Sequence, residues 1–159
     1  HVLTYKAKRY LRTYLYRMKK IPYQRCTYCH PLPGDEVIGF TEHDKSVTIH
    51  KRDCPTAIRL ASQKGDSIVS IELKEDNDIL YPVRIHIKAI DSYHLLSDLI
   101  DCITNKLKLS IESLHTTITD EIVDCFINFS VHSLNELQII ISHINRIKGV
   151  DEVQREELK

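Results

Sequence analysis

Four residues with metal-binding side chains lie close together in the first third of the chain. Cys26 and Cys29 form a C-x2-C pair, and after twenty intervening residues His50 and Cys54 form an H-x3-C pair. Each pair can reach one metal ion from a single turn or from one end of a short helix. Three thiolates and one imidazole would complete a tetrahedral zinc shell, so the spacing predicts a zinc site. The alternative is a metal-free fold in which the cysteines are small buried hydrophobic residues.

The predicted zinc shell is closed, which argues against catalysis. A catalytic zinc keeps one position open for water, whereas four protein ligands fill the shell. A zinc deaminase would need an H-x-E and a P-C-x-x-C motif, and neither occurs in the sequence. Only four glycines are present, and they form no phosphate-binding loop. A Cys/His nucleophile pair stays open, although no third orienting group is evident. We therefore expect a non-catalytic chain.

Charge is balanced over the chain but not along it. The 159 residues suit two small domains, and 22 basic residues offset 22 acidic ones, so the sum indicates no nucleic-acid or membrane partner. Residues 1–24 contain no acid, and their apolar residues recur at helical spacing, which predicts a basic amphipathic helix ended by Pro22. Its basic residues are Lys6, Lys8, Arg9, Arg12, Arg17, Lys19 and Lys20. Interleaved tyrosines make this helix a candidate RNA-binding surface. The alternative is a solvated face that packs on an upstream domain.

Cysteine usage and hydropathy predict a cytoplasmic protein without a membrane partner. Five cysteines, three of them in a metal-like arrangement, fit a reducing compartment better than a disulfide framework. No apolar run reaches the roughly 20 residues of a membrane span. The chain begins at His1 rather than Met, so we expect a fragment whose upstream functions are missing.

Residues 25–76 are predicted to form a small α/β domain around the metal site. A rigid turn at residues 31–35, with sequence PLPGD, precedes short strands at 37–41 and 47–50. Pro55 is suited to the first position of a helix that continues to about residue 64. Residues 67–74 alternate in hydropathy like a strand, and the acidic connector 75–78 marks a domain boundary.

The next strand, around residues 83–89, predicts a sheet with one covered and one open side. Its apolar residues alternate with Arg84, His86 and Lys88, which makes those three a candidate partner face. The alternative is an ordinary solvated face. A helix follows, with Asp91 or Ser92 available as its cap. Its predicted apolar stripe consists of Leu95, Leu96, Leu99, Ile100, Ile103 and Leu107.

The rest of the chain completes a recognisable order of elements. Residues 109–119 and 122–132 predict a hairpin that turns at Asp120-Glu121, with a bulge between Ile111 and Leu114. Ser133-x-x-Glu136 is a capping box for a second helix, and residues 150–156 form the last strand. The order βαββαβ predicts a four-stranded antiparallel sheet with both helices on one face, the ferredoxin-like arrangement.

Two runs of residues resemble a known family. The motifs CHPLPGD at 29–35, Gly39-Phe40 and HKRDCP at 50–55 resemble the zinc-finger region of the long Rel/SpoT-type stringent-response enzymes. In that family an ACT domain follows, and the segment after Tyr81 resembles one, with DSYHLL at 91–96 in its strand-to-helix turn. We therefore expect an α+β protein with an N-terminal basic helix (1–24), a zinc-finger-like α/β domain (25–76) and a ferredoxin-like ACT domain (79–159).

The resemblance implies a regulatory role in bacteria. Such enzymes make and hydrolyse (p)ppGpp with N-terminal catalytic domains, and their C-terminal half contacts ribosomal RNA and uncharged tRNA. The chain would then be a non-catalytic regulatory fragment of a GTP pyrophosphokinase that acts on its own N-terminal catalytic domains. The alternative is an ACT module that forms a homodimer or senses a small molecule, such as an amino acid, without binding RNA.

The sequence departs from the family pattern at two positions. Cys29, His50 and Cys54 occupy family ligand positions, but Tyr28 stands where the family has a second, adjacent cysteine. Cys26 takes the fourth ligand position on the geometry of the C-x2-C spacing alone. At the strand-to-helix turn of the ACT-like segment, His94 stands where ligand-binding ACT domains carry glycine.

Overall fold

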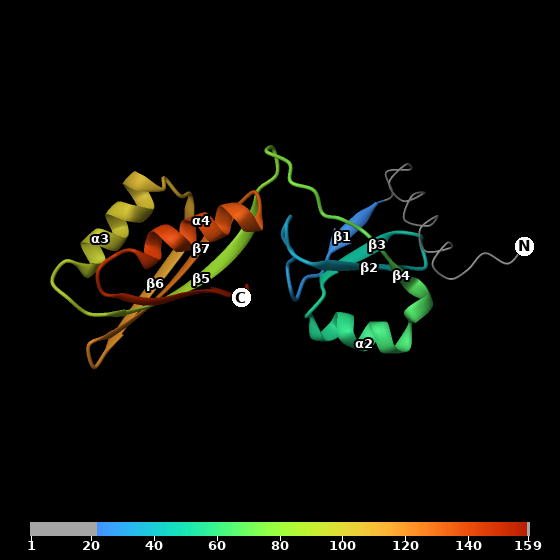
Figure 1. Cartoon of the computed structure of the whole chain (residues 1–159), viewed down its shortest axis with the longest axis horizontal. Helices are drawn as coiled ribbons and strands as arrows, with labels where there is room; N and C mark the ends of the chain where they lie inside the picture. Colours follow the sequence, from blue (N-terminus) through green and yellow to red (C-terminus); the bar gives the residue numbers. More distant parts are fainter. Residues whose placement is uncertain (1–21, 159) are drawn as a thin grey trace, which may run out of the picture. The chain divides into compact units, whose positions relative to one another are not determined.

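The computed structural model describes residues 22–158, and the chain divides into two compact units, with the division between Lys74 and Glu75 (Figure 1). The basic helix predicted for residues 1–24 lies almost wholly outside the described residues. In the described part of the chain, no helix has the length and apolar character needed to cross a membrane.

The first unit is a four-stranded sheet with one helix. Its elements are β1 (Tyr23–Arg25), β2 (Val37–Thr41), β3 (Val47–Lys51), α2 (Pro55–Gln63), a 3₁₀ turn at Gly65–Ser67 and β4 (Ile68–Val69). The strand order is β1-β3-β2-β4; β1 runs parallel to β3, and the other pairs are antiparallel. Helix α2 runs along one side of the sheet (Figure 1). The α/β character expected for this part of the chain is confirmed.

Apolar residues fill both sides of this small sheet. Phe40 and Ala57 are buried together with Cys26 and Cys54, so the predicted metal ligands are part of the core beneath α2. A second cluster on the sheet consists of Val47, Ile49, Val69 and Leu73. Gly39 lies at the centre of β2, where a Cβ atom would stand 2.9 Å from three side chains. The glycine therefore allows the second cluster to pack closely against the strand.

Two features of this unit differ from the sequence prediction. The strand expected over residues 67–74 is only two residues long, Ile68–Val69, and pairs with Gly39 and Phe40. The alternation in hydropathy after Val69 reflects burial of side chains rather than pairing with another strand, because Leu73 is buried although it lies outside β4. Strand β1 was not predicted because three mostly exposed residues carry no periodic signal. It is held in place by backbone bonds on either side, from the Val47 N–H to Pro22 and from the Cys26 N–H to Ile49.

The second unit has the predicted ferredoxin-like fold. Its elements are β5 (Tyr81–Ile90), α3 (Leu95–Asp101), a π-helical turn η2 (Cys102–Lys106), β6 (Ile111–Thr119), β7 (Ile122–Val131), α4 (Leu134–Asn145) and β8 (Val150–Glu156). All neighbouring strands are antiparallel in the order β6-β7-β5-β8. Both helices lie on one face of the sheet (Figure 1). The core lies between helices and sheet and includes Ile85, Ile87, Ile127, Phe129, Leu95, Leu137 and Ile144.

The hairpin and the second helix form as their turn chemistry predicts. Asp120 and Glu121 both have positive φ, 51° and 66°, as a two-residue hairpin turn requires, and the register shifts between Ile111 and Ser113, which confirms the bulge. Ser133 caps α4, because its Oγ accepts a hydrogen bond from the Glu136 N–H at 3.2 Å. The Glu136 carboxylate bonds the backbone N–H of His132 at 2.8 Å, one residue before the position a capping box would use.

Helix α3 differs from the prediction in its N-cap residue and in the exposure of two residues of its predicted apolar stripe. His94, rather than Asp91 or Ser92, occupies the N-cap position, and no side chain caps the helix there. Leu96 and Ile100 belong to the predicted apolar stripe, but they are 37% and 53% exposed. The buried face consists of Leu95, Leu99, Cys102 and Ile103, and the last two belong to the π-helical turn that follows.

Candidate metal centre

The structure brings Cys26, Cys29, His50 and Cys54 together in one cluster. One ligand atom from each residue, a cysteine Sγ or a ring nitrogen of His50, lies within 4.8 Å of all the others. Cys26 follows β1, Cys29 lies in the next turn, His50 belongs to β3, and Cys54 is the N-cap of α2. The cluster thus joins four segments of the first unit.

The first two cysteines are positioned by a turn with several internal hydrogen bonds. The Cys26 N–H is bonded to the Ile49 carbonyl at 2.8 Å, which attaches the turn to β3, and the His30 N–H returns to the Cys26 carbonyl at 3.0 Å. Further along, the Asp35 carboxylate accepts a 2.7 Å bond from the N–H of Leu32, whose side chain is fully buried. The PLPGD sequence therefore anchors the turn that carries Cys29.

His50 and Cys54 are positioned by the end of β3 and the start of α2. The His50 ring packs edge-on against Phe40, with ring centroids 5.6 Å apart. The Cys54 N–H is bonded to the Lys51 carbonyl at 3.1 Å, and Pro55 begins the helix, where its missing N–H leaves no bond unmade. The Cys54 Sγ lies 3.8 Å from the His50 Nδ1.

Backbone N–H groups point at the sulfur atoms. The Tyr28 N–H lies 3.4 Å from the Cys26 Sγ, and the Lys51 N–H lies 3.3 Å from the Cys29 Sγ. Burial raises the pKa of Cys54, but hydrogen bonds from the N–H groups of Ala57 and Thr56 and from the neighbouring thiols outweigh it, so the net shift is downward. Such N–H groups stabilise thiolates, which are the form that binds metal.

The other titratable groups also fit a metal-binding role. Burial raises the pKa of Cys29 to about 12, although the Lys51 N–H opposes the shift, so this thiol is protonated in metal-free protein near neutral pH. Burial lowers the pKa of His50, against a smaller opposing effect of Glu42, so its imidazole is neutral and has a free lone pair. Cys26, His50 and Cys54 are buried and Cys29 is half-buried. The cluster could hold a metal ion, with three sulfur donors and one nitrogen donor.

The predicted partner face has internal partners of its own. Arg84, His86 and Lys88 lie on the side of β5 away from the buried face. His86 contacts Asp124 at 2.7 Å through Nε2 and Glu156 at 3.5 Å through Nδ1. Its ring is stacked on Phe126 at 4.2 Å, and the Arg84 guanidinium lies over the same ring at 4.6 Å. Asp124, Phe126 and Glu156 were not predicted from the sequence as neighbours of His86. The alternation of buried and exposed residues along β7 and β8 could have placed them on this side of the sheet.

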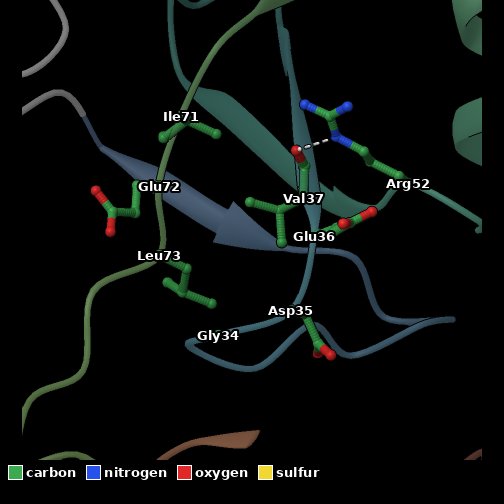
Figure 2. Close-up of a pocket in the computed structure, with 8 residues that line it drawn as sticks. All are labelled: Gly34, Asp35, Glu36, Val37, Arg52, Ile71, Glu72 and Leu73. Carbon is green, nitrogen blue, oxygen red and sulfur yellow. Dashed lines mark hydrogen bonds between the residues drawn. The ribbon is translucent and has the colours of Figure 1, made fainter.

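A separate cavity of about 400 Å³ lies in the first unit (Figure 2). Three carboxylates, those of Asp35, Glu36 and Glu72, belong to its lining, together with Arg52. The Arg52 Nε donates a 3.3 Å hydrogen bond to the Val37 carbonyl (Figure 2). The remaining lining residues are Gly34, Val37, Ile71 and Leu73. The acidic lining disfavours phosphate groups, and none of the four cluster residues belongs to it.

Two family models match consecutive parts of the chain. The RelA/SpoT RIS domain matches residues 15–74, and the ACT domain matches residues 77–155. The bifunctional (p)ppGpp synthase/hydrolase RelA of Mycobacterium tuberculosis is 25% identical over 127 residues, which are 80% of this chain and 17% of that protein. The GTP pyrophosphokinase of Escherichia coli K12 is 24% identical over 132 residues, 82% of this chain and 18% of that protein. The chain thus spans less than a fifth of the length of these curated relatives.

Among solved structures, the ACT domain from the GTP pyrophosphokinase of Chlorobium tepidum resembles this chain with a TM-score of 0.46 and 18% identity. The similarity covers 49% of this chain and all of that domain.

Proposed function

Because the chain belongs to the RelA/SpoT family as a regulatory C-terminal region with a RIS domain and an ACT domain, we propose that it binds ribosomal RNA and uncharged tRNA and thereby controls N-terminal catalytic domains. Those domains would make and hydrolyse (p)ppGpp in the cytoplasm. The chain itself would carry no catalytic residue. We infer this because four protein ligands would fill the coordination shell of a zinc ion and leave no position for water.

The single observation that carries this proposal is the closed Cys/His cluster. Cys26, Cys29, His50 and Cys54 would hold one zinc ion, because three soft sulfur donors and one imidazole are a typical donor set for structural zinc. The bound zinc would supply a cross-link and no open coordination position. The four side chains would fix the end of β1, the following turn, β3 and the start of α2 relative to each other. A rigid surface built on these segments suits recognition rather than catalysis.

The basic segment supplies the charge for RNA binding. Seven cations occur in residues 1–24 without a single acid. Each phosphate contact releases counterions, which gives a slope of about −0.7 to −0.9 in the logarithm of affinity against the logarithm of salt concentration. Four to seven contacts therefore predict a slope between about −3 and −6.

On the sheet of the second unit, we assign Arg84, His86 and Lys88 to a contact with a protein partner, since their charges are partly matched within the face.

The test is binding of the full chain to ribosomes and to uncharged tRNA over a range of salt concentrations. One variant replaces Lys6, Lys8, Arg9 and Arg12 with glutamine. The matched control replaces four cations of the second unit, Lys106, Lys108, Arg146 and Lys148. We expect the first variant to lose affinity and about 3 units of slope, and the control to bind nearly as the unaltered chain. Binding that is absent, or that does not depend on salt, would contradict the proposal.

A second candidate function, homodimer formation, is favoured by exposed apolar residues in the second unit. Strand β6 lies at one edge of its sheet, and edge strands present backbone groups for pairing with another chain. Leu114 and Ile118 on β6 are 46% and 50% exposed, and α3, which leads into β6, exposes Leu96 and Ile100. Sedimentation should detect a dimer that Ile118→Lys converts to monomer. A monomer at high concentration of the unaltered chain would remove this candidate.

A further inference from the structure

The thiols of the metal cluster differ in their access to solvent. Cys26 and Cys54 are 8% and 2% exposed, and His50 is 4% exposed, so these three ligands are shielded from reagents in solution. Cys29 is only half-buried and lies in the turn between β1 and β2. Cys29 is thus the least buried residue of the four, and the cluster is easiest for a small oxidant to approach on its side.

We propose that the cluster is a redox-sensitive switch, in which a hydroperoxide joins Cys26 and Cys29 in a disulfide and the zinc ion is released. The inference rests on the proposed zinc site and adds a regulatory input to it. Thiolates that share a site with a second cysteine within a few ångströms are the usual targets of reversible oxidation. All ligand atoms here lie within 4.8 Å of one another, so a resolving cysteine is close by.

The chemistry is a two-electron oxidation of two thiolates. The Cys29 thiolate attacks the O–O bond of the peroxide, which forms a sulfenic acid and releases hydroxide. The Cys26 thiolate then attacks the sulfenic sulfur, the S–S bond forms, and a second hydroxide leaves. Each hydroxide takes up one proton, so hydrogen peroxide and two protons become two water molecules. The two sulfur atoms supply the two electrons.

Cys26 is the resolving partner because it shares a single turn with Cys29. The turn is closed by the 3.0 Å bond from the His30 N–H to the Cys26 carbonyl, so the two sulfur atoms can approach by side-chain rotation. Cys54 is the N-cap of α2, and its backbone is bonded to the Lys51 carbonyl and to the Ile58 N–H, so its approach to Cys29 would move the start of the helix.

Release of zinc follows from the loss of half the ligand set. A disulfide sulfur is a poor metal donor, since the thiolate is the form of cysteine that binds metal. His50 and Cys54 would be left as the only ligands of the four. Without the metal, the start of α2 is no longer tied to the turn after β1. Oxidation would therefore loosen the part of the first unit that the zinc holds together.

The chain contains its own matched controls, Cys102 and Cys125. Both lie in the second unit, both are buried, at 5% and 2% exposure, and burial raises the pKa of each thiol. Zinc would hold the cluster cysteines as thiolates, whereas Cys102 and Cys125 are not part of that cluster and stay protonated, and protonated thiols react slowly with peroxide. A variant with Cys102→Ala and Cys125→Ala should therefore behave like the unaltered chain.

The experiment treats the zinc-loaded full chain with hydrogen peroxide, follows zinc release with a chromophoric chelator, and counts thiols by alkylation after unfolding. We expect one zinc released per disulfide, five alkylatable thiols reduced to three, and a peptide map with a Cys26–Cys29 link. Dithiothreitol with added zinc should reverse the change. In the variant lacking Cys102 and Cys125, the thiol count should fall from three to one.

Several results would overturn the inference. One is zinc that stays bound at peroxide concentrations that oxidise a free thiol added to the same solution. Another is a disulfide that maps to Cys54, or zinc release without any disulfide. A purified chain that cannot be loaded with zinc would instead contradict the proposed metal site, and this inference with it. Retained zinc leaves the proposed site standing, so the two failures are distinguishable.

Discussion

Replacing Cys26 with serine tests the least expected ligand of the cluster. Cys26 follows β1, is 8% exposed, and has its Sγ within 4.8 Å of the other three ligand atoms. Structural zinc sites contribute about 10–16 kcal/mol near neutral pH, or about 3 kcal/mol for each of four ligands. Since about 1.4 kcal/mol corresponds to a factor of ten, Cys26→Ser should weaken zinc binding about a hundredfold.

The assay is competition for zinc between the chain and a chromophoric chelator of known affinity. Tyr28→Ser is the matched control, because Tyr28 occupies the same turn but is 49% exposed. We expect the control to bind zinc as tightly as the unaltered chain. If Cys26→Ser keeps its affinity within about threefold, Cys26 is only a buried core residue and the four-ligand site is wrong. If both variants lose affinity equally, the turn itself, rather than the sulfur, is responsible.

Three further predictions concern stability and pH. Gly39→Ala should destabilise the first unit by about 1–3 kcal/mol, because the added Cβ would lie 2.9 Å from three side chains. Gly65→Ala is the control and should be tolerated, because its Cβ would have no atom within 4 Å. Equal midpoints of urea unfolding for the two variants would contradict this prediction. Ser133→Ala should lower the free energy of unfolding of the second unit by about 1 kcal/mol, because it removes the cap of α4. Urea unfolding measures this change, and an unchanged midpoint would show that the 3.2 Å bond contributes nothing to stability. Zinc affinity should rise with pH, because binding must remove the proton of Cys29, whose pKa is about 12. His50 has a lowered pKa and stays neutral over this range, so it adds little to the pH dependence. A zinc affinity that does not change between about pH 6 and 8 would contradict this prediction.

Periodic and motif signals predicted the second unit well. Alternation along β5, the capping residue Ser133 and the turn at Asp120-Glu121 are local features, and each has the structure that its chemistry favours. The four cluster residues were identified by spacing, because a metal shell demands short-range pairs that sequence shows directly. Local signals of this kind do not depend on how distant segments pack.

Features that depend on distant segments were not predictable in this way. The alternation after β4 reports burial, and sequence alone does not distinguish burial from strand pairing, so the strand was predicted too long. The exposure of Leu96 and Ile100 depends on which part of the apolar stripe of α3 faces the sheet, and the sequence does not show this. The acidic cavity combines residues 34–37 with residues 71–73, which meet only in the folded sheet (Figure 2). The carboxylate neighbours of His86, Asp124 and Glu156, were not predicted, because they come from β7 and β8.

The metal content of the purified full chain tests the proposed zinc site most directly. We predict one zinc ion per chain that survives dialysis, because three thiolates and one imidazole would close the coordination shell, and the four residues lie in a largely buried cluster. Removal of that zinc by a strong chelator should unfold or loosen the first unit while the second unit keeps its sheet. A chain that contains no zinc, cannot be loaded with it, and shows the same stability with and without chelator would contradict a structural zinc site.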